Sequence, residues 1–300
     1  MMLKGLRSGI STIGRNKKMI FVYYFFNLVF GLLVAIPFYA VVSNLAGNTL
    51  IGEKLGGRMD IDFFFEFLIK SSNAMDALKG IALVIPVLYG VWGIFLSGGA
   101  YACLVRSEHY TAQVFWGNAA KFFWRFFRLF LLSIPVFVIL FCLQFVETGI
   151  VRLLYGKDPY ESVIYWGAWI RVGFGYIGIL LYFLILDYAR IYTVAMDEWR
   201  MWKALWFGIR FSFRHFFTTF GLSLVIFILG IILLFIYNPV ADLMHNPGAL
   251  ILLALFIVQQ LYMLVRMMLK LTLYSSQVRI FESILPDITE EHVIPPLVSP

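Results

Sequence analysis

The sequence predicts an all-α membrane protein: a polytopic bundle of six transmembrane helices, arranged as three helical hairpins, with amphipathic helices at the membrane interface. Hydrophobic residues make up 61% and charged residues only 14% of the 300 residues, a composition outside the range of soluble globular domains. Crossing a bilayer takes about 20 apolar residues per helix. Six runs satisfy this requirement, at residues 19–42, 80–105, 127–147, 163–186, 216–237 and 249–273.

Residues 1–281 are expected to form one six-span domain, because the spans and their connections leave no room for a separate soluble domain. The first apolar run is expected to be a retained helix rather than a signal peptide, since it is long and no small-residue cleavage site follows it. In the connection 43–79, the aromatic run at residues 60–70 is expected to form a helix that contacts either lipid or protein. The tail 282–300 is rich in Pro and acidic residues and is expected to be cytoplasmic and partly disordered.

The distribution of positive charge predicts the orientation. Seventeen of the 24 Lys and Arg residues fall before the first span, in the second connection and the first turn of the third span, in the fourth connection, or from residue 266 onward. The positive-inside rule then places both termini in the cytoplasm. The net charge of +7 indicates contact with anionic lipid headgroups, so no nucleic-acid partner is needed to explain it.

The stretch Asp187–His215 is basic, aromatic and amphipathic, and it is expected to be a helix lying on the membrane surface between two spans. Residues 1–18 and 106–126 resemble it. The spacing of six between Gly9 and Arg15 recurs between Gly208 and Arg214. These similarities predict a parallel threefold repeat with units 1–105, 106–186 and 187–273, each a surface helix followed by two spans.

Several local features carry structural expectations. Pro37 is expected to kink or end the first span and Pro135 to kink the third, while the fifth span is expected to end at residues 237–239. The small residues from Ser97 to Ala100 are expected to let another helix approach closely. Cys103 and Cys142 are the only cysteines, and both are expected to be buried apolar residues rather than metal ligands or a disulfide.

No catalytic, cofactor-binding or metal-binding constellation is recognisable. Zinc-protease, nucleophile-elbow and Walker motifs do not occur, so the chain is not expected to be an enzyme. Residues 173–178 match the dinucleotide pattern G-x-G-x-x-G, but they lie in mid-span, where glycines favour helix packing. The central parts of the spans hold no Asp or Glu, which disfavours ion-coupled transport because such carriers keep a carboxylate at membrane depth.

The polar residues within or beside the spans are the candidate functional positions. Arg171 is expected either to extend outward to the interface or to pair with a carboxylate, of which Glu147, Glu161 and Asp242 are candidates. Three glutamines are expected either to form hydrogen bonds between helices or to contact a substrate; they are Gln144, Gln259 and Gln260. Asp187 and Arg190 share a helix face and are expected to be a structural ion pair or a docking point for a cytoplasmic partner.

The sequence Asp187-Tyr188-Ala189-Arg190 at a cytoplasmic span end, followed by a basic aromatic helix, resembles uncharacterised six-span bacterial inner-membrane proteins. The layout is also similar to the membrane region attached to some glycerophosphodiester phosphodiesterases, whose catalytic domain this sequence lacks. The leading hypothesis is a non-enzymatic membrane protein that binds lipid or other membrane proteins. The alternative is a permease or channel-like component for a small or lipophilic solute, which convergence of Arg171 and the three glutamines on one cavity would favour.

Overall fold

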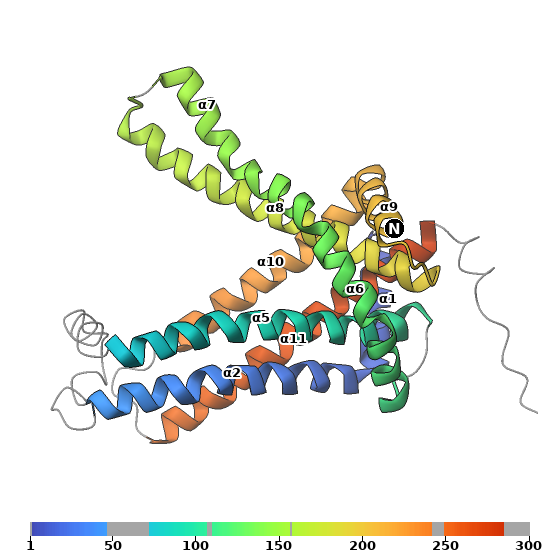
Figure 1. Ribbon diagram of the computed structural model, residues 1–300, viewed down its shortest axis with the longest axis horizontal. Coiled ribbons are helices and arrows are strands. Elements are labelled where there is room, and N and C mark those ends of the chain that lie inside the picture. Colours follow the sequence, from blue (N-terminus) through green and yellow to red (C-terminus); the bar gives the residue numbers. More distant parts are fainter. Residues whose placement is uncertain (1, 47–71, 107–109, 157, 242–248, 285–300) are drawn as a thin grey trace, which may run out of the picture. The chain divides into compact units, whose positions relative to one another are not determined.

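The computed structural model describes residues 2–46, 72–106, 110–156, 158–241 and 249–284, and this part of the chain contains helices and no strand. The all-α prediction is therefore confirmed. The elements, shown in Figure 1, are α1 (Met2–Arg15), α2 (Lys17–Ala46), α5 (Ser72–Val105), α6 (Ala112–Phe141), the 3₁₀ helix η1 (Cys142–Phe145), α7 (Val146–Tyr155), α8 (Glu161–Ala195), α9 (Met201–Arg214), α10 (Phe216–Ala241) and α11 (Ala249–Ile284). The expected helix at 60–70, Asp242, the turn at 246–248 and the tail from 285 lie outside the described residues.

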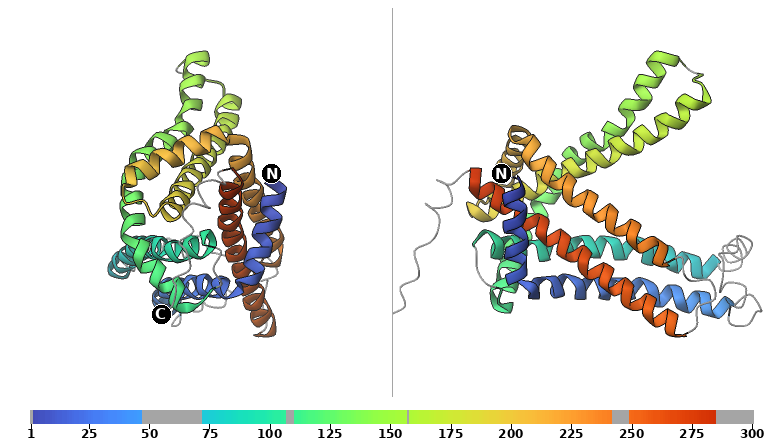
Figure 2. Two further views of the ribbon diagram at one scale, coloured as in Figure 1. Left: turned by 90° about the vertical axis from the view of Figure 1, so that its right-hand side faces the viewer. Right: turned by 180° about the vertical axis from the view of Figure 1, so that it is seen from behind.

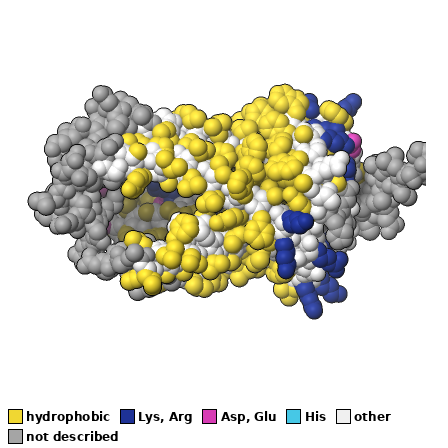
Figure 3. Space-filling model, turned by 90° about the horizontal axis from the view of Figure 1, so that it is seen from below, with side chains coloured by type: hydrophobic (Ala, Val, Ile, Leu, Met, Phe, Trp, Pro, Cys, Tyr) yellow, Lys and Arg dark blue, Asp and Glu magenta, His cyan; other side chains and the backbone are white. Residues whose placement is uncertain are grey.

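In the described part of the chain, six apolar segments are long enough to cross a membrane, as the sequence predicts. They are Lys17–Val41, Leu78–Val105, Ala112–Tyr155, Glu161–Ala195, Phe216–Pro239 and Leu250–Ile284. Figure 3 shows apolar side chains over most of the visible surface of the described helices. An apolar exterior of this kind is unfavourable in water and favourable against hydrocarbon, so the chain is a multi-pass membrane protein.

The described helices fall into two compact units. The first contains residues 1–15, 97–227 and 272–300, and the second contains residues 16–96 and 228–271. In the second unit, α2 packs through aromatic contacts with α5, such as Phe26 with Trp92, whose ring centroids are 4.9 Å apart. The Tyr89 hydroxyl donates to Asn27 over 3.2 Å. These contacts join the first two spans as a hairpin.

The first unit is organised around α8, which packs along α6, η1 and α7 on one side and against α9 at its C-terminal end. Figure 1 shows α7 running beside the N-terminal half of α8, and Figure 2 shows α1 crossing the last turns of α11. Ser133 on α6 and Tyr182 on α8 share a hydrogen bond of 2.9 Å. The unit therefore combines parts of all three predicted hairpins.

The boundary between surface helices and spans differs from the sequence prediction. Residues 187–195 continue α8 rather than start a surface helix, and a turn at residues 196–200 separates them from α9. The amphipathic part of 106–126 is the first half of α6, continuous with the third span. The expectation of two uninterrupted surface segments, 106–126 and 187–215, was therefore wrong, because no helix-breaking residue separates either segment from its neighbouring span.

Two further expectations are corrected, and one about the fifth span is confirmed. The helix α2 continues past Pro37, so this proline does not end the first span, since a proline can remain within a membrane helix when neighbouring groups satisfy the freed carbonyl. The fifth apolar segment ends at Pro239, as expected, although helix α10 runs on to Ala241. Cys103 is buried, but Cys142 is exposed. Cys142 begins η1 on a face that no described helix covers, so its apolar character suits lipid rather than a protein core.

Candidate functional site

Asp187 and Arg190, near the C-terminal end of α8, form the polar centre of the first unit. Arg190 donates through Nη1 to Oδ1 of Asp187 over 3.2 Å. Nε2 of Gln277, from the end of α11, donates to the other carboxylate oxygen over 3.3 Å. All three residues are buried, with at most 7% of their surface exposed. The burial of Asp187 and Arg190 favours the structural ion pair over the docking point.

Aromatic rings enclose this ion pair. The rings of Tyr101, on α5, and Tyr274, on α11, lie 4.6 Å apart, and the guanidinium of Arg190 lies 5.8 Å from the ring centre of Phe126 on α6. Four helices thus meet at one charged centre. In such surroundings the loss of one partner leaves an uncompensated buried charge, which costs about 3–5 kcal/mol.

The helix α9 is held against α8 by a close crossing and by stacked rings. A Cβ on Gly208 would lie 2.6 Å from the carbonyl oxygen of Ile185 and 3.0 Å from Cβ of Ala189, so only glycine allows the backbones to approach this far. Tyr192 stacks on Phe207 with 4.1 Å between ring centroids. The last turns of α8 are consequently enclosed rather than exposed at a membrane surface.

Two similar crossings join other surface segments to other span ends. At the end of α5, a Cβ on Gly99 would lie 2.7 Å from the carbonyl oxygen of Phe115, in the first half of α6. At the end of α11, a Cβ on Gly9 of α1 would collide with the side chain of Ser276. The predicted close approach at Ser97–Ala100 is therefore confirmed. The threefold repeat itself stays a prediction, although each of its three surface segments makes one such crossing.

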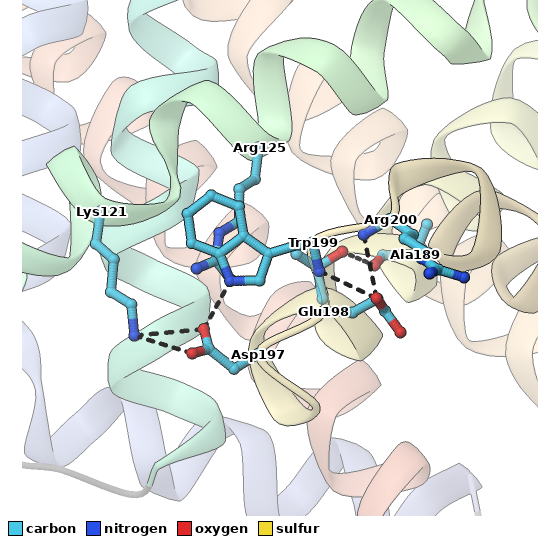
Figure 4. Close-up of polar contacts among 8 residues, drawn as sticks. Lys121, Arg125, Ala189, Asp197, Glu198, Trp199 and Arg200 are labelled. Carbon is cyan, nitrogen blue, oxygen red and sulfur yellow. Dashed lines mark hydrogen bonds and ion pairs between the residues drawn. The ribbon is translucent and has the colours of Figure 1, made fainter.

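The turn between α8 and α9 is bound to α6 by a second charged cluster (Figure 4). Asp197, which has a positive φ of 46°, accepts a hydrogen bond of 2.7 Å from Nη1 of Arg125 on Oδ1 and one of 3.4 Å from Nζ of Lys121 on Oδ2. The guanidinium of Arg125 also lies 3.7 Å from the ring centre of Trp199. Figure 4 shows this indole beside Arg125, with Lys121 reaching the same carboxylate. Arg125 is 2% exposed, so the turn covers it.

The carboxyl groups of this turn are held in the charged form. Partial burial opposes ionisation of Asp197, but the hydrogen bond from Arg125, together with the charges of Arg125 and Lys121, lowers its pKa below the ordinary value. The hydrogen bond from Lys203 and those from the backbone N–H groups of Arg200 and Trp199 lower the pKa of Glu198. Both acids therefore cancel basic charge close to the start of α9.

A third charged pair lies between α7 and α8, within the spans. Arg171 donates through Nε to Oε2 of Glu147 over 3.2 Å, and Thr148 donates to the same oxygen over 3.1 Å. Arg171 is thus paired with one of the candidate carboxylates. Because η1 and α7 extend the third span to Tyr155, Glu147 lies within a span and is 6% exposed. Glu147 lies near the C-terminal end of this segment and not in its centre, so the expectation that the central parts of the spans hold no Asp or Glu is not contradicted.

The three glutamines have different environments. Gln144 is half-buried in η1 beside Gly175, in the first unit. In the second unit, Gln260 accepts a hydrogen bond of 2.7 Å from the Tyr24 hydroxyl, and Gln259 is exposed. The interhelical hydrogen bond expected of these residues is thus present at Gln260.

The glycines of the dinucleotide-like pattern support helix packing. A Cβ on Gly178 would collide with the carbonyl oxygen of Leu140, and one on Gly175 would contact Gln144 at 3.6 Å. Gly173 has open space around its Cα. The pattern therefore lets α8 approach the end of α6 and η1, and its position in mid-helix offers no N-terminus to a pyrophosphate.

Sequence reasoning missed several members of these clusters. Nothing in the sequence singles out Arg125, Asp197 or Gln277. Their membership depends on contacts 72 and 90 residues apart in the chain, for which one sequence carries no signal. Among the residues that the structure describes, no three His, Cys, Asp or Glu side chains lie close enough to share a metal ion.

Comparisons with known proteins add no homologue, since no family model, no curated protein and no solved structure matches this chain.

Proposed function

We propose that this chain is a non-enzymatic, multi-pass inner-membrane protein that binds lipid or other membrane proteins, and that the outer face of α9 contacts anionic lipid headgroups. Both termini are then cytoplasmic, and α9 lies at the inner interface. The observation that carries the proposal is the exposed face of α9, opposite the face that packs on α8.

Aromatic and basic side chains form neighbouring stripes on that face. At 3.6 residues per turn, Trp202, Trp206 and Phe213 fall on one line along the helix, and all three are exposed. The exposed basic residues fall on the adjoining line; they are Lys203, Arg210 and Arg214. Indole and phenyl rings favour the boundary between acyl chains and headgroups, while lysine and arginine favour phosphates. The two stripes together suit the headgroup layer of an anionic membrane.

The buried contacts explain why this face is presented outward. The crossing at Gly208 and the ring contacts to α8 fix the rotation of α9 about its own axis. The cluster at Asp197 fixes the turn that precedes it. Because α9 cannot rotate to bury its tryptophans, the membrane has to solvate them.

The test is retention of lipid by the purified protein. Each basic residue near an anionic surface contributes about 1 kcal/mol, so the double variant Arg210→Gln/Arg214→Gln should lose about 2 kcal/mol, or roughly thirty-fold in its preference for anionic over zwitterionic lipid. The preference is measured by mass spectrometry of lipids bound after exchange into mixed vesicles. Arg152→Gln, on α7, is the matched control and should leave the preference unchanged. Equal loss in both variants would argue against a headgroup contact on α9.

The second candidate function is a permease or channel-like component for a small or lipophilic solute. The pair between Glu147 and Arg171 favours it, because ionisable groups inside a membrane span commonly mark a solute pathway. Uptake of labelled solutes into vesicles that contain the protein tests this candidate. Transport that is lost in Glu147→Gln would support it, whereas vesicles no more permeable than protein-free ones would count against it.

A further inference from the structure

The hairpin of α7 and α8 contains a groove next to the pair of Glu147 and Arg171. It has a volume of about 360 Å³ and is partly open to the outside. Its lining is almost entirely apolar and aromatic, and includes Ile150, Leu154, Trp166, Ile170 and Phe174. Small-molecule sites of about 300–1,000 Å³ with apolar walls and a few placed polar groups have this character.

The polar end of the groove has hydrogen-bonding capacity that the described residues do not use. Both bonds to Glu147 reach Oε2, so Oε1 is available as an acceptor. Arg171 does not itself line the groove, but it is bound to Glu147, which does. The pair engages only Nε of Arg171, which leaves the N–H groups of its two terminal nitrogens as donors. The Arg171 side chain is 45% exposed although it lies within a span. A Cβ on Gly167 would collide with Oε1 of Glu147, so the glycine at this position gives that oxygen its space.

A single carboxylic acid group can bind both the acceptor on Glu147 and the N–H donors on Arg171. In its protonated form it carries one O–H donor, suited to Oε1 of Glu147, and one carbonyl acceptor, suited to the terminal N–H groups of Arg171. The neutral acid adds no net charge to a pair that is already balanced. That balance matters within a membrane, where an uncompensated charge is costly. An apolar chain on the acid would fill the rest of the groove.

We propose that the groove between α7 and α8 binds a small lipophilic carboxylic acid, with its acid group on Glu147 and Arg171 and its hydrocarbon part along Ile150, Trp166 and Phe174. This site is separate from the headgroup contact on α9. If the protein is a permease or channel-like component, lipophilic carboxylic acids are the class of solute that this site would bind. Binding requires no covalent step.

The test uses a ten-carbon fatty acid that carries a diazirine near its chain end, with the full-length protein in nanodiscs. After illumination, labelled peptides are mapped by mass spectrometry, and peptides from α2 serve as the reference for general labelling from the bilayer. We expect labelling of residues 150–174 above this reference. Unlabelled decanoic acid should reduce it, and methyl decanoate, which has the same chain but no O–H group, should not.

Two variants and one control locate the site. Arg171→Gln should lower the specific labelling roughly ten-fold or more, the usual consequence of losing hydrogen bonds to a charged group. Ile150→Trp should fill the groove and lower labelling while leaving the charged pair in place, which guards against misfolding of the first variant. Arg152→Gln, an exposed arginine outside the groove lining, should label as the parent protein does.

Labelling of residues 150–174 no higher than that of α2, equal competition by the methyl ester, or equal labelling in Arg171→Gln and Arg152→Gln would each overturn the proposal. Retention of anionic lipid is measured on the same Arg171→Gln preparation. Because that measurement reports on α9, it separates failure of the groove site from failure of the headgroup contact.

Discussion

The crossing of α9 over α8 gives the sharpest test of how the first unit is held together. The perturbation is Gly208→Ala. Its new Cβ would lie 2.6 Å from the carbonyl oxygen of Ile185 and 3.0 Å from the backbone nitrogen of Ala189. Backbone atoms cannot rotate away as a side chain can, so α9 has to move outward. Overpacking of this kind costs about 3 kcal/mol at its upper end.

The same substitution also has a favourable effect that must be subtracted. Alanine stabilises a helix interior by about 1 kcal/mol relative to glycine. The net loss expected for Gly208→Ala is therefore about 2 kcal/mol. Gly117→Ala, on α6, is the matched control, because nothing lies within 4 Å of its added Cβ. It should gain up to about 1 kcal/mol, so the two variants should differ by about 3 kcal/mol.

The assay uses the buried thiol of Cys103 as the reporter, in a background where the exposed Cys142 is replaced by serine. A maleimide dye then reacts as the first unit unfolds with temperature or denaturant. Gly208→Ala should expose the thiol at a clearly lower temperature than the parent protein, and Gly117→Ala should not. If Gly208→Ala is at least as stable as Gly117→Ala, the close crossing does not hold α9 in place.

Three other predictions follow from the charged clusters and the fold. Arg190→Ala should cost about 3–5 kcal/mol because it leaves Asp187 buried without its cation, and the neutral pair Asp187→Asn/Arg190→Gln should recover much of that loss in the same thiol assay. Because the pKa of Asp197 is lowered in the folded protein, its stabilising contribution is complete above its unfolded pKa of about 3.9 and is lost as pH falls through the lower folded value. Asp197→Asn should therefore remove a small part of the acid destabilisation, and an unchanged pH profile would count against the cluster. The topology can be tested with single cysteines placed at Ser8, Ser72 or Ser283 in a cysteine-free background. An impermeant maleimide added from outside should react only with the cysteine at position 72. External labelling at position 8 or 283 would overturn the orientation.

The sequence by itself determined the fold class and the number of spans. Runs of apolar residues long enough to cross a bilayer specify helices without any tertiary contact, because hydrocarbon leaves the backbone no other hydrogen-bonding partner. The sequence also predicted the amphipathic helices α1 and α9, since apolar residues that recur every 3.6 residues indicate a helix with one buried face. The pairing of Asp187 with Arg190 followed from their spacing on a helix.

The tertiary structure alone decided what those pairs and faces contact. Whether Asp187 is a surface group or a buried one depends on α9, which covers the end of α8 through the crossing at Gly208. Which of the candidate carboxylates pairs with Arg171 depended on the packing of α7 against α8, which brings Glu147 within 3.2 Å of its Nε. Hydrophobic periodicity is a local property and fixes which residues avoid water. Charged pairing and close helix crossings depend on distances between residues far apart in the chain, and these are set only when the helices pack.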